Sequence, residues 1–326
     1  MLKNDLKLNQ NHRIIFRDNK DMTTYKSLSE NKIDLLALTG LMLEEFNILL
    51  PNFKQAYDET YPIHFTKTGA LRQRIKKVFL KESLAELEDK LLFILAYEKT
   101  NCHQTLFGEL FNLSQPRISA LVHELTPILK LALEKMKHLP VRNALDLSNE
   151  LNQDKTERDI IVDGMERDRS RPVDATKQTE NYSGKNKCHT DKNIVISDPI
   201  DTRVLYLSPT YSGKTHDKAM LDKCELIIPS HIGVYKDTGF QGYEPIDVQT
   251  CQPKKKTKNY KLDSEDKTIN QYISKIRVTV EHTICGIKRS RVIKDICRCW
   301  QDDFRDLLTL IACGLHNLRV SARFAI

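Results

Sequence analysis

The sequence lacks the features of several protein classes. Its first residues, MLKNDLKLNQNHRIIF, have no apolar core of the kind found in signal peptides, and no apolar run elsewhere approaches membrane-spanning length. The eight cysteines are scattered, and only Cys297 and Cys299 are close, at a spacing unusual for zinc. Both SGK segments lack the full glycine pattern of a phosphate-binding loop. We therefore expect a cytoplasmic protein with reduced, mostly buried thiols and no membrane partner.

Positive charge is present in excess and is unevenly distributed. The chain has 51 Lys and Arg against 44 Asp and Glu, a formal net charge of +7. One short run contains five lysines and no acid: Lys254, Lys255, Lys256, Lys258 and Lys261. A second basic group follows at 288–298, opposed only by Asp295. Either run could be a solvated surface, but their concentration favours an anionic partner. We interpret Lys254, Lys255 and Lys256 as DNA contacts.

Residues 269–291, INQYISKIRVTVEHTICGIKRSR, predict one amphipathic helix. Apolar residues recur every three or four positions and form one stripe: Ile273, Ile276, Val280, Ile284 and Ile287. Arg277, Glu281 and Lys288 share a second face, because four and seven residues separate them. One carboxylate between two cations is a poor metal site by itself. Glu281 becomes a candidate ligand only if other carboxylates meet it, and a surface ion pair is its alternative role.

We expect a helical region over residues 1–140 of the 326-residue chain, which is long enough for two domains. A helix is predicted at 41–50, with Thr39 as its N-cap and Pro51 as its stop, and another at 87–97. Residues 103–126 predict a helix-turn-helix, with one helix at 104–111 and a second starting from Ser114.

Six apolar residues suit a core for this helix-turn-helix: Leu106, Leu110, Leu113, Ile118, Leu121 and Val122. Ser114, Gln115 and Arg117 would then point outward from the start of the second helix, the end that enters a DNA major groove. Many two-helix units with this pattern do not bind DNA, so the alternative stays open at this stage.

Residues 141–157 are polar without a sustained period and predict a linker. From residue 158 to 326 the pattern changes to an α/β domain of mixed sheet. RDIIVDG, KNIVISD, TRVLYLS, HIGVYKDTG and EPIDVQTCQP predict strands, and HDKAMLDKCELI predicts a helix. A final apolar-periodic helix, DDFRDLLTLIACGLHNLRVSARF, is expected to pack behind the sheet.

Asp163 and Asp237 each follow an apolar strand. If those strands are neighbours, both carboxylates emerge at one end of the sheet, where Glu281 can join them from the packed helix. Three acids at one place repel unless a cation compensates, so the set predicts a divalent metal with oxygen ligands. Mg²⁺ suits it, with Mn²⁺ as the alternative, and two ions would serve phosphodiester displacement. Arg277 and Lys288, flanking Glu281 on the exposed face, would hold the DNA backbone.

Several nearby polar residues have simpler interpretations. Asp163 and Asp237 could each be a turn aspartate at a strand end. Asp217 is interpreted as a helix N-cap rather than a fourth ligand, and Glu166 as a solvated loop residue rather than one that assists Asp163. His189, His216 and His282 are interpreted as packing or DNA-contacting residues, since metal-bound water needs no histidine base.

An ordered set of motifs resembles the DDE transposases of bacterial insertion sequences, closest to the insertion-sequence-five type with its Harbinger-type relatives. The motifs are DGMERDRSRP, YSGKNKCHTDKNIVISD, SGKTHDKAML, KDTGFQGY and RVTVEHTICGIKRSRVI. LTGLMLEEFNILLPNF and the segment 103–126 also resemble the N-terminal part of that family, so the similarity covers about residues 35–320. Asp163, Asp237 and Glu281 match the catalytic triad. Related transposases carry Y-x2-R-x3-E-x6-K, which Arg277, Glu281 and Lys288 fit, whereas Ser274 replaces the tyrosine.

The resemblance implies an RNase H-like fold, preceded by an all-α helix-turn-helix domain. It also implies DNA cleavage at terminal inverted repeats and strand transfer by the freed 3′-hydroxyl. Double-stranded DNA would be the partner, and pairing of two element ends favours a homodimer located at the nucleoid. A domesticated nuclease that cuts without joining, or a DNA-binding regulator with a silent catalytic domain, are the alternatives.

Overall fold

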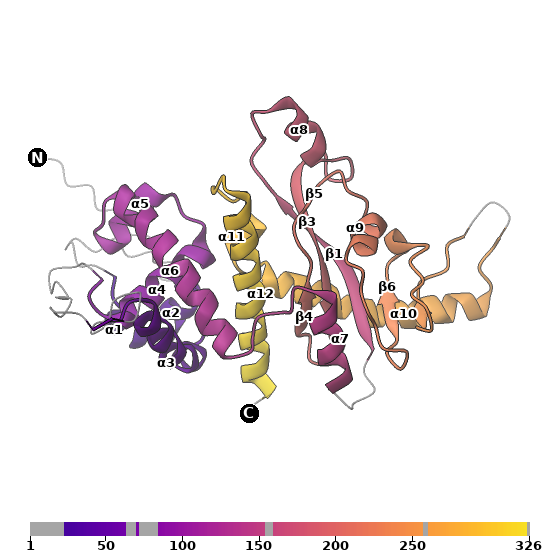
Figure 1. Ribbon diagram of the computed structural model, residues 1–326, viewed down its shortest axis with the longest axis horizontal. Coiled ribbons are helices and arrows are strands. Elements are labelled where there is room, and N and C mark those ends of the chain that lie inside the picture. The colour runs from indigo at the N-terminus through magenta and orange to yellow at the C-terminus, as the bar shows by residue number, and fades with distance from the viewer. Residues whose placement is uncertain (1–22, 63–69, 72–83, 154–158, 257–259, 325–326) are drawn as a thin grey trace, which may run out of the picture.

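The computed structural model describes residues 23–62, 70–71, 84–153, 159–256 and 260–324. The N-terminal part is helical and lies at the left of Figure 1. Its helices are α1 (Tyr25–Ser29), α2 (Lys32–Thr39), α3 (Leu43–Thr60), α4 (Leu87–Thr100), α5 (Gln104–Phe111) and α6 (Gln115–Lys135). Their apolar faces form one buried core, in which α4 is covered along nearly its whole length. A further basic segment, with Lys67, Arg72, Arg74, Lys76 and Lys77, lies outside the described residues.

The predicted helix at 41–50 is real but has different ends. Thr39 closes α2 instead of capping the next helix, because Gly40 adopts the left-handed backbone (φ 73°) that ends helices. Pro51 does not stop α3, which continues to Thr60. A proline removes one helix hydrogen bond, and burial of Leu49 and Phe53 on either side of it holds the helix in place.

Residues 103–126 form two helices with a tight turn, as predicted. Asn112 takes a left-handed conformation at the end of α5, and Ser114 occupies the cap position of α6. Ile118, Leu121 and Val122 are buried as expected, but Leu106 and Leu110 are 59% and 39% exposed. Phe107 and Phe111 fill that core instead, against Phe93, because aromatic rings bury more apolar area than leucine.

The segment predicted as a linker carries a helix, α7 (Ala144–Gln153). Leu147 and Leu151 on α7 pack into the core on one face of the sheet, and residues 154–158 lie outside the described part. Leu147 and Leu151 are four residues apart, a spacing that indicates a helix. The linker prediction gave more weight to the polar composition of the segment.

A seven-stranded mixed sheet forms the C-terminal part, at the right of Figure 1. Its strands are β1 (Ile160–Asp168), β2 (Tyr182–Ser183), β3 (Cys188–Ser197), β4 (Val204–Leu207), β5 (Tyr211–Ser212), β6 (Val234–Lys236) and β7 (Thr250–Cys251). β3 pairs antiparallel with β1 on one side and with β2, β4 and β5 on the other. β6 pairs parallel with β1, and β7 pairs parallel with β6. All five predicted strands are therefore present.

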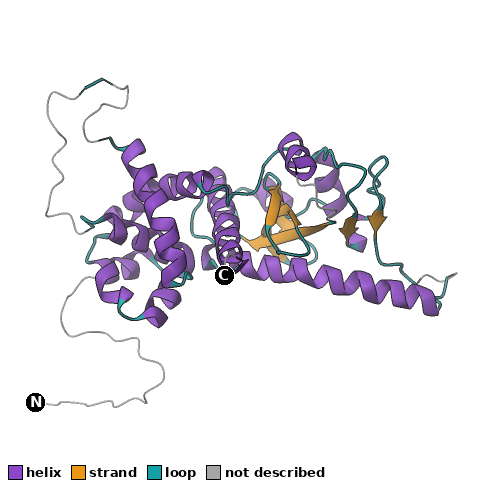
Figure 2. Ribbon diagram, turned by 90° about the horizontal axis from the view of Figure 1, so that it is seen from below, coloured by secondary structure: helices purple, strands orange, loops and turns teal. Residues whose placement is uncertain are grey.

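Helices cover both faces of this sheet. On one face, α7 and α9 (Asp217–Lys223) pack against side chains such as Val162 and Ile194. On the other, α10 (Ser264–Ile287) packs against Ile161 and Tyr235. A short 3-10 helix η1 (Thr238–Phe240) follows β6, and α8 (Ala175–Asn181) follows β1. Figure 2 shows α10 as one long helix beneath the sheet, as its apolar stripe predicted.

The last helix, α12 (Asp302–Phe324), joins the two parts of the protein. Leu308 and Cys313 pack with α11 (Arg291–Lys294) on the sheet core, whereas Ile311, Leu315 and Leu318 enter the N-terminal helical core. α12 therefore packs behind the sheet as predicted, but also serves as part of the helical region (Figure 1). None of the described helices is long and apolar enough to cross a membrane.

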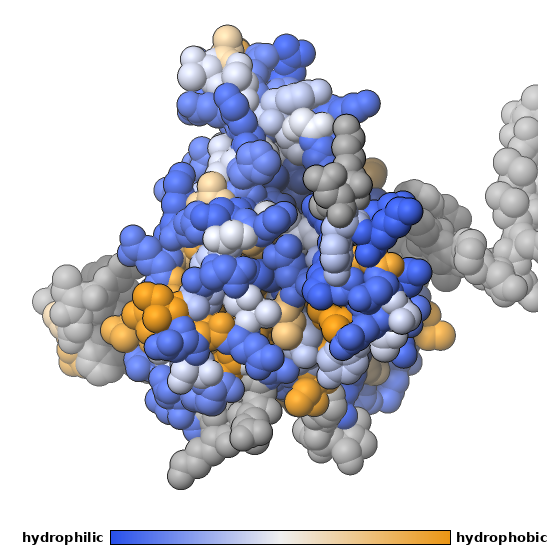
Figure 3. Space-filling view, turned by 90° about the vertical axis from the view of Figure 1, so that its right-hand side faces the viewer, coloured by the Kyte–Doolittle hydropathy of each residue, from blue (hydrophilic) through white to orange (hydrophobic). Residues whose placement is uncertain are grey.

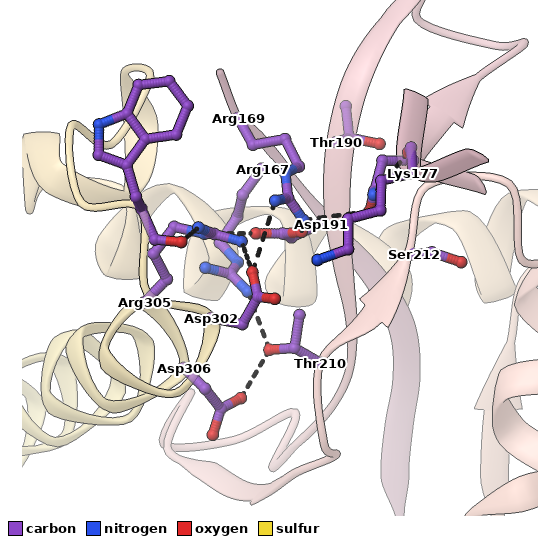
Figure 4. Close-up of polar contacts among 12 residues, drawn as sticks. Arg167, Arg169, Lys177, Thr190, Asp191, Thr210, Ser212, Asp302, Arg305 and Asp306 are labelled. Atoms are coloured by element: carbon purple, nitrogen blue, oxygen red, sulfur yellow. Dashed lines mark hydrogen bonds and ion pairs between the residues drawn. The ribbon is translucent and has the colours of Figure 1, made fainter. Parts of the chain in front are cut away.

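A buried charge network fixes the start of α12 to the sheet (Figure 4). Asp191 of β3 accepts hydrogen bonds from Arg305 Nε at 2.9 Å and from Arg169 Nη1 at 2.8 Å. Arg167 of β1 donates to the side chain of Asn193 at 2.8 Å. Each buried charge of this network thus has polar partners. The periodic strand and helix patterns of the sequence do not reveal these contacts.

Candidate active site

Asp163 and Asp237 lie at equivalent positions on neighbouring parallel strands. The register pairs Val162 with Lys236, so Asp163 is the next residue of β1 and Asp237 directly follows β6. The expectation that Asp163 follows its strand is wrong, because β1 continues to Asp168 in its ladder with β3. Because side chains alternate between faces, both follow Ile161 and Tyr235 onto the face covered by α10. The two strands are therefore neighbours, which is the condition that the sequence set for these two carboxylates to meet.

Backbone amides and one guanidinium orient the two carboxylates. Asp163 accepts from the Gly164 amide at 2.8 Å, and Asp237 accepts from the Thr238 amide at 2.6 Å. Arg277 of α10 forms an ion pair with Asp237, with 3.3 Å between Nη1 and Oδ1. Burial raises the pKa of Asp163, and the charges of Asp237 and Asp217 add to this, while the Gly164 amide and Arg277 oppose it. The site thus places negative charges close enough to repel.

Glu281 is on α10 but does not join the aspartates through any described contact. It lies one turn beyond Arg277, about 6 Å further along the helix axis, and its side chain is exposed. In the described part of the chain, no group of three or more His, Cys, Asp and Glu side chains is arranged to hold a metal ion. The structure brings Asp163 and Asp237 together, and carries Glu281 on the helix that packs against the same face.

The donor set nevertheless fits a hard divalent cation. Mg²⁺ is usually held by one or two protein carboxylates, with waters and substrate phosphates in its remaining positions. Asp163 and Asp237 supply two such carboxylates, and both hydrogen-bond through a single oxygen to backbone amides. Figure 3 shows that this end of the molecule, where β6 and α10 lie, is largely hydrophilic. The residues present are therefore compatible with metal-dependent phosphate chemistry.

Asp217 is a neighbour of this site that sequence reasoning assigned to a different role. It is the first residue of α9, and His216 occupies the cap position, so the N-cap prediction is wrong. A methyl group at Gly239 would lie 3.2 Å from Asp217 Oδ2, and one at Gly164 would lie 3.6 Å from its Oδ1. Lys192 of β3 neutralises it at 3.4 Å. No spacing along the chain links Asp217 with Asp163; only the packing of α9 on β1 does.

Arg277 and Lys288 differ from the expectation that they stand on an exposed face. The side chain of Arg277 is only 17% exposed and is directed at Asp237. Lys288 donates from Nζ to the backbone carbonyl of Glu166 at 2.9 Å, and burial lowers its pKa. Both cations therefore connect α10 to the strand ends, because the helix packs with this side toward β1 and β6.

The other predicted DNA contacts are more accessible. Lys254 pairs with Asp266 at 2.6 Å, which ties its loop to the first turn of α10, whereas Lys255 and Lys256 are exposed. Lys258 lies outside the described residues.

The predicted recognition residues also lie on the surface. Ser114, Gln115 and Arg117 are all exposed at the start of α6. Gln115 donates to Gln104 of α5 at 2.7 Å, so this contact links the two helices.

Two of the remaining polar candidates, Glu166 and His189, have structural partners. Glu166 is a strand residue that accepts a hydrogen bond from Thr190 at 2.6 Å, so its interpretation as a solvated loop residue is wrong. His189 packs edge-on against Tyr182, and His282 is exposed. All eight cysteines are free thiols, but only Cys224, Cys297 and Cys313 are buried, so the expectation that most of the thiols are buried is wrong.

Two comparisons with known proteins found similarities, one of them to the region that contains the candidate site. Residues 162–317 match the family described as DDE superfamily endonuclease, a span that contains Asp163, Asp237 and Glu281. The chain is 24% identical over 237 residues to a probable transposase for insertion sequence element IS702 from Microchaete diplosiphon. That alignment covers 73% of this chain and 82% of the relative. None of the solved structures shows a significant match. The C-terminal half of the chain is therefore similar to DDE superfamily endonucleases, and most of the chain is similar to an insertion-sequence transposase.

Proposed function

We propose that this protein is a transposase of a bacterial insertion sequence, of the insertion-sequence-five type with Harbinger-like relatives. It binds the terminal inverted repeats of its element, cleaves DNA by metal-dependent phosphodiester hydrolysis and joins the 3′-ends to target DNA. One observation carries the proposal: Asp163 within β1 and Asp237 directly after β6 are adjacent in register, on the sheet face covered by the helix that carries Glu281. The mixed sheet with helices on both faces supports an RNase H-like fold for residues 158–326.

Asp163, Asp237 and Glu281 would hold the metal, which we propose to be two Mg²⁺ or Mn²⁺ ions. When bound, such ions supply an activated water and offset the charge that develops on the phosphate. The protein orients the two carboxylates before a metal binds, because the backbone amides of Gly164 and Thr238 each hold one oxygen of Asp163 and Asp237, respectively. Exposure of Glu281 leaves its carboxylate free of competing protein contacts in the described chain, so it is available for ligation.

Binding of double-stranded DNA would involve both parts of the protein. We propose that Ser114, Gln115 and Arg117 at the start of α6 read the inverted repeat, because they are exposed beside the tight turn. Lys254, Lys255 and Lys256 would contact phosphates near the site. Arg277 and Lys288 would do so only after exchanging their present partners. Two protomers would pair two element ends at the nucleoid.

An assay with labelled element ends and Mg²⁺ separates this proposal from its two alternatives. Nicking at the repeat ends followed by joining to a target duplex is the expected result. Nicking without joining would indicate a nuclease, and binding without nicking would indicate a regulator. Short inverted repeats bracketing the gene would supply the substrate sequence, and their absence together with lack of joining would contradict the transposase.

A further inference from the structure

Positively charged side chains from three helices and a turn gather where the helical region meets the catalytic region. We call this group the basic seam: Lys99 of α4, Arg289, Arg291 and Lys294 after α10, and Arg319 and Arg323 of α12. Lys99 Nζ donates to the carbonyl of Arg289 at 3.2 Å, and Arg319 Nη2 donates to that of Gly286 at 2.7 Å. These contacts draw cations from distant parts of the sequence to one place.

The seam is poorly neutralised by the protein itself. Within the described ranges, only Arg291 of this group forms an ion pair, with Asp295 at 2.8 Å. Glu45 lies near Arg319, but one of its oxygens accepts from the Met42 amide. Glu98 precedes Lys99 but is fully buried, and burial raises its pKa well above the ordinary value. The positive charges therefore face one another with little compensation.

The cations lie close enough to lower one another's pKa values. Burial lowers the pKa of Lys99, and the neighbouring charges of Arg289, Arg319, Arg291 and Lys294 lower it further. Burial and the charge of Arg289 lower the pKa of Arg319 to about 10, Glu45 opposes them, and Arg323 lowers it further. Repulsion between these like charges opposes folding, so a contribution to the stability of the fold does not explain the seam. Binding of an external anion explains it better.

Its position connects it to the candidate active site. Arg289 directly follows Lys288, whose Nζ contacts the carbonyl of Glu166 on β1, three residues beyond Asp163. Glu281 lies eight residues before Arg289, about 12 Å along α10. A phosphate chain leaving the strand ends along this helix would meet the seam next. Arg291, Lys294 and Arg323 are exposed and Arg289 is half-buried, so several phosphates of a duplex could contact them, whereas Arg319 is only 3% exposed and lies beneath.

We propose that the basic seam binds the phosphate backbone of double-stranded DNA adjacent to the bond that is cut. This inference rests on the proposed function for its orientation, since the cleaved bond would lie at Asp163 and Asp237. It assigns a sequence-independent contact surface that is separate from the exposed start of α6.

The test uses the full-length chain carrying Asp237→Asn, so that binding is measured without cleavage. A seam variant combines Arg289→Gln, Lys294→Gln and Arg323→Gln. A control variant removes three exposed or half-exposed cations elsewhere, through Lys26→Gln, Lys130→Gln and Lys218→Gln. Fluorescence anisotropy follows binding to a 30-base-pair duplex of unrelated sequence over a series of KCl concentrations.

We expect the seam variant to lose at least about tenfold in affinity and its salt slope to fall by about 2 to 3, because each lost phosphate contact removes about 0.9 from that slope. The control variant should keep the parent slope. Equal salt slopes for the seam and control variants would overturn the proposal. Binding to anionic vesicles and to an acidic polypeptide is measured as well, and a seam variant that loses either of these while its duplex binding is unchanged would also overturn it. Cleavage of element ends is measured separately, so failure of the transposase assignment remains distinguishable.

A second variant excludes a trivial loss of folding. Lys99→Met keeps an unbranched side chain against Gly40, where the Lys99 methylenes pack, and removes the charge. Relief of repulsion should leave its melting temperature equal to or above that of the parent while its duplex affinity falls. A lower melting temperature together with unchanged duplex affinity would show that Lys99 is a structural residue and would overturn its place in the seam.

Discussion

The guanidinium of Arg277 lies 3.3 Å from the carboxylate of Asp237, at the end of the sheet where a divalent ion would be expected. The same arginine lowers the pKa of Asp163 against the larger effect of burial. One side chain of α10 therefore supplies the positive charge that two adjacent aspartates require. Metal binding would have to compete with this ion pair or share the site with it.

Arg277→Met should destabilise the protein modestly when no divalent ion is present. The substitution keeps the aliphatic part of the side chain but leaves Asp163 and Asp237 without their nearest cation. Because Asp237 is 42% exposed, we expect a loss of about 1 kcal/mol in the free energy of unfolding. Urea denaturation at pH 7 measures it, with Lys275→Met, an exposed lysine on the same helix, as the matched control. Equal losses for both variants would contradict the role given to Arg277.

Asp163→Asn should stabilise the metal-free protein in a pH-dependent manner. Burial raises the pKa of Asp163 above its ordinary value of 3.8, so its ionised form is less favourable in the folded than in the unfolded state. The stability associated with the protonated carboxyl is fully present below 3.8 and is lost as the pH rises through the folded pKa. The variant should therefore melt higher than the parent at pH 7, and the difference should vanish on acidification. Exposed Asp303→Asn serves as control, and a pH-independent difference for Asp163→Asn would refute the interpretation.

Asp191→Asn should be among the most destabilising single changes in the sheet. Asp191 is 4% exposed and neutralises Arg305, itself 5% exposed, and Arg169 (Figure 4). Removing its charge leaves buried guanidinium groups without their main partner, which costs about 3 kcal/mol or more. Chemical denaturation of this variant beside Asp303→Asn, an exposed acid of the same region, tests the estimate. A change below about 0.5 kcal/mol, the size usual for surface positions, would show that the network is dispensable.

Arg117→Ala should weaken recognition of the element ends without changing the fold. Arg117 is exposed in the first turn of α6, and an arginine that reads a base edge is worth about 1–3 kcal/mol of discrimination. The measurement is the ratio of affinities for the inverted repeat and for a scrambled duplex. Lys130→Ala, further along the same helix, should leave this ratio unchanged. If Arg117→Ala also leaves it unchanged, α6 does not read the repeat.

Periodic patterns predicted the elements that position the site. The β-branched runs before Asp163 and Asp237 are buried on both faces of the sheet, so their sequences were distinctive, and both formed strands. The stripe of Ile273 and Val280 likewise predicted α10, because that helix buries one continuous face. Asp163 and Asp237 lie close together because the two predicted strands are adjacent in the sheet.

Features that depend on tertiary packing were not accessible in the same way. Leu110 and Phe111 are equally apolar neighbours, and only packing against Phe93 decides that the phenylalanine is buried. The inward direction of Lys288 depends on the rotation of α10 against β1, which the repeat alone does not determine. Asp217 reaches the site across the sheet face, with Gly164 and Gly239 leaving space for its carboxylate.

Cleavage of a labelled inverted-repeat end by the Asp237→Asn variant in Mg²⁺ is the most direct test of the central claim. The variant keeps the shape of the side chain but removes a proposed metal ligand, while Asp222→Asn, on the surface of α9, provides a matched control. The account predicts that Asp237→Asn binds the DNA end with parental affinity and produces no nick, whereas Asp222→Asn cuts normally. Nicking by Asp237→Asn at the parental rate would contradict it.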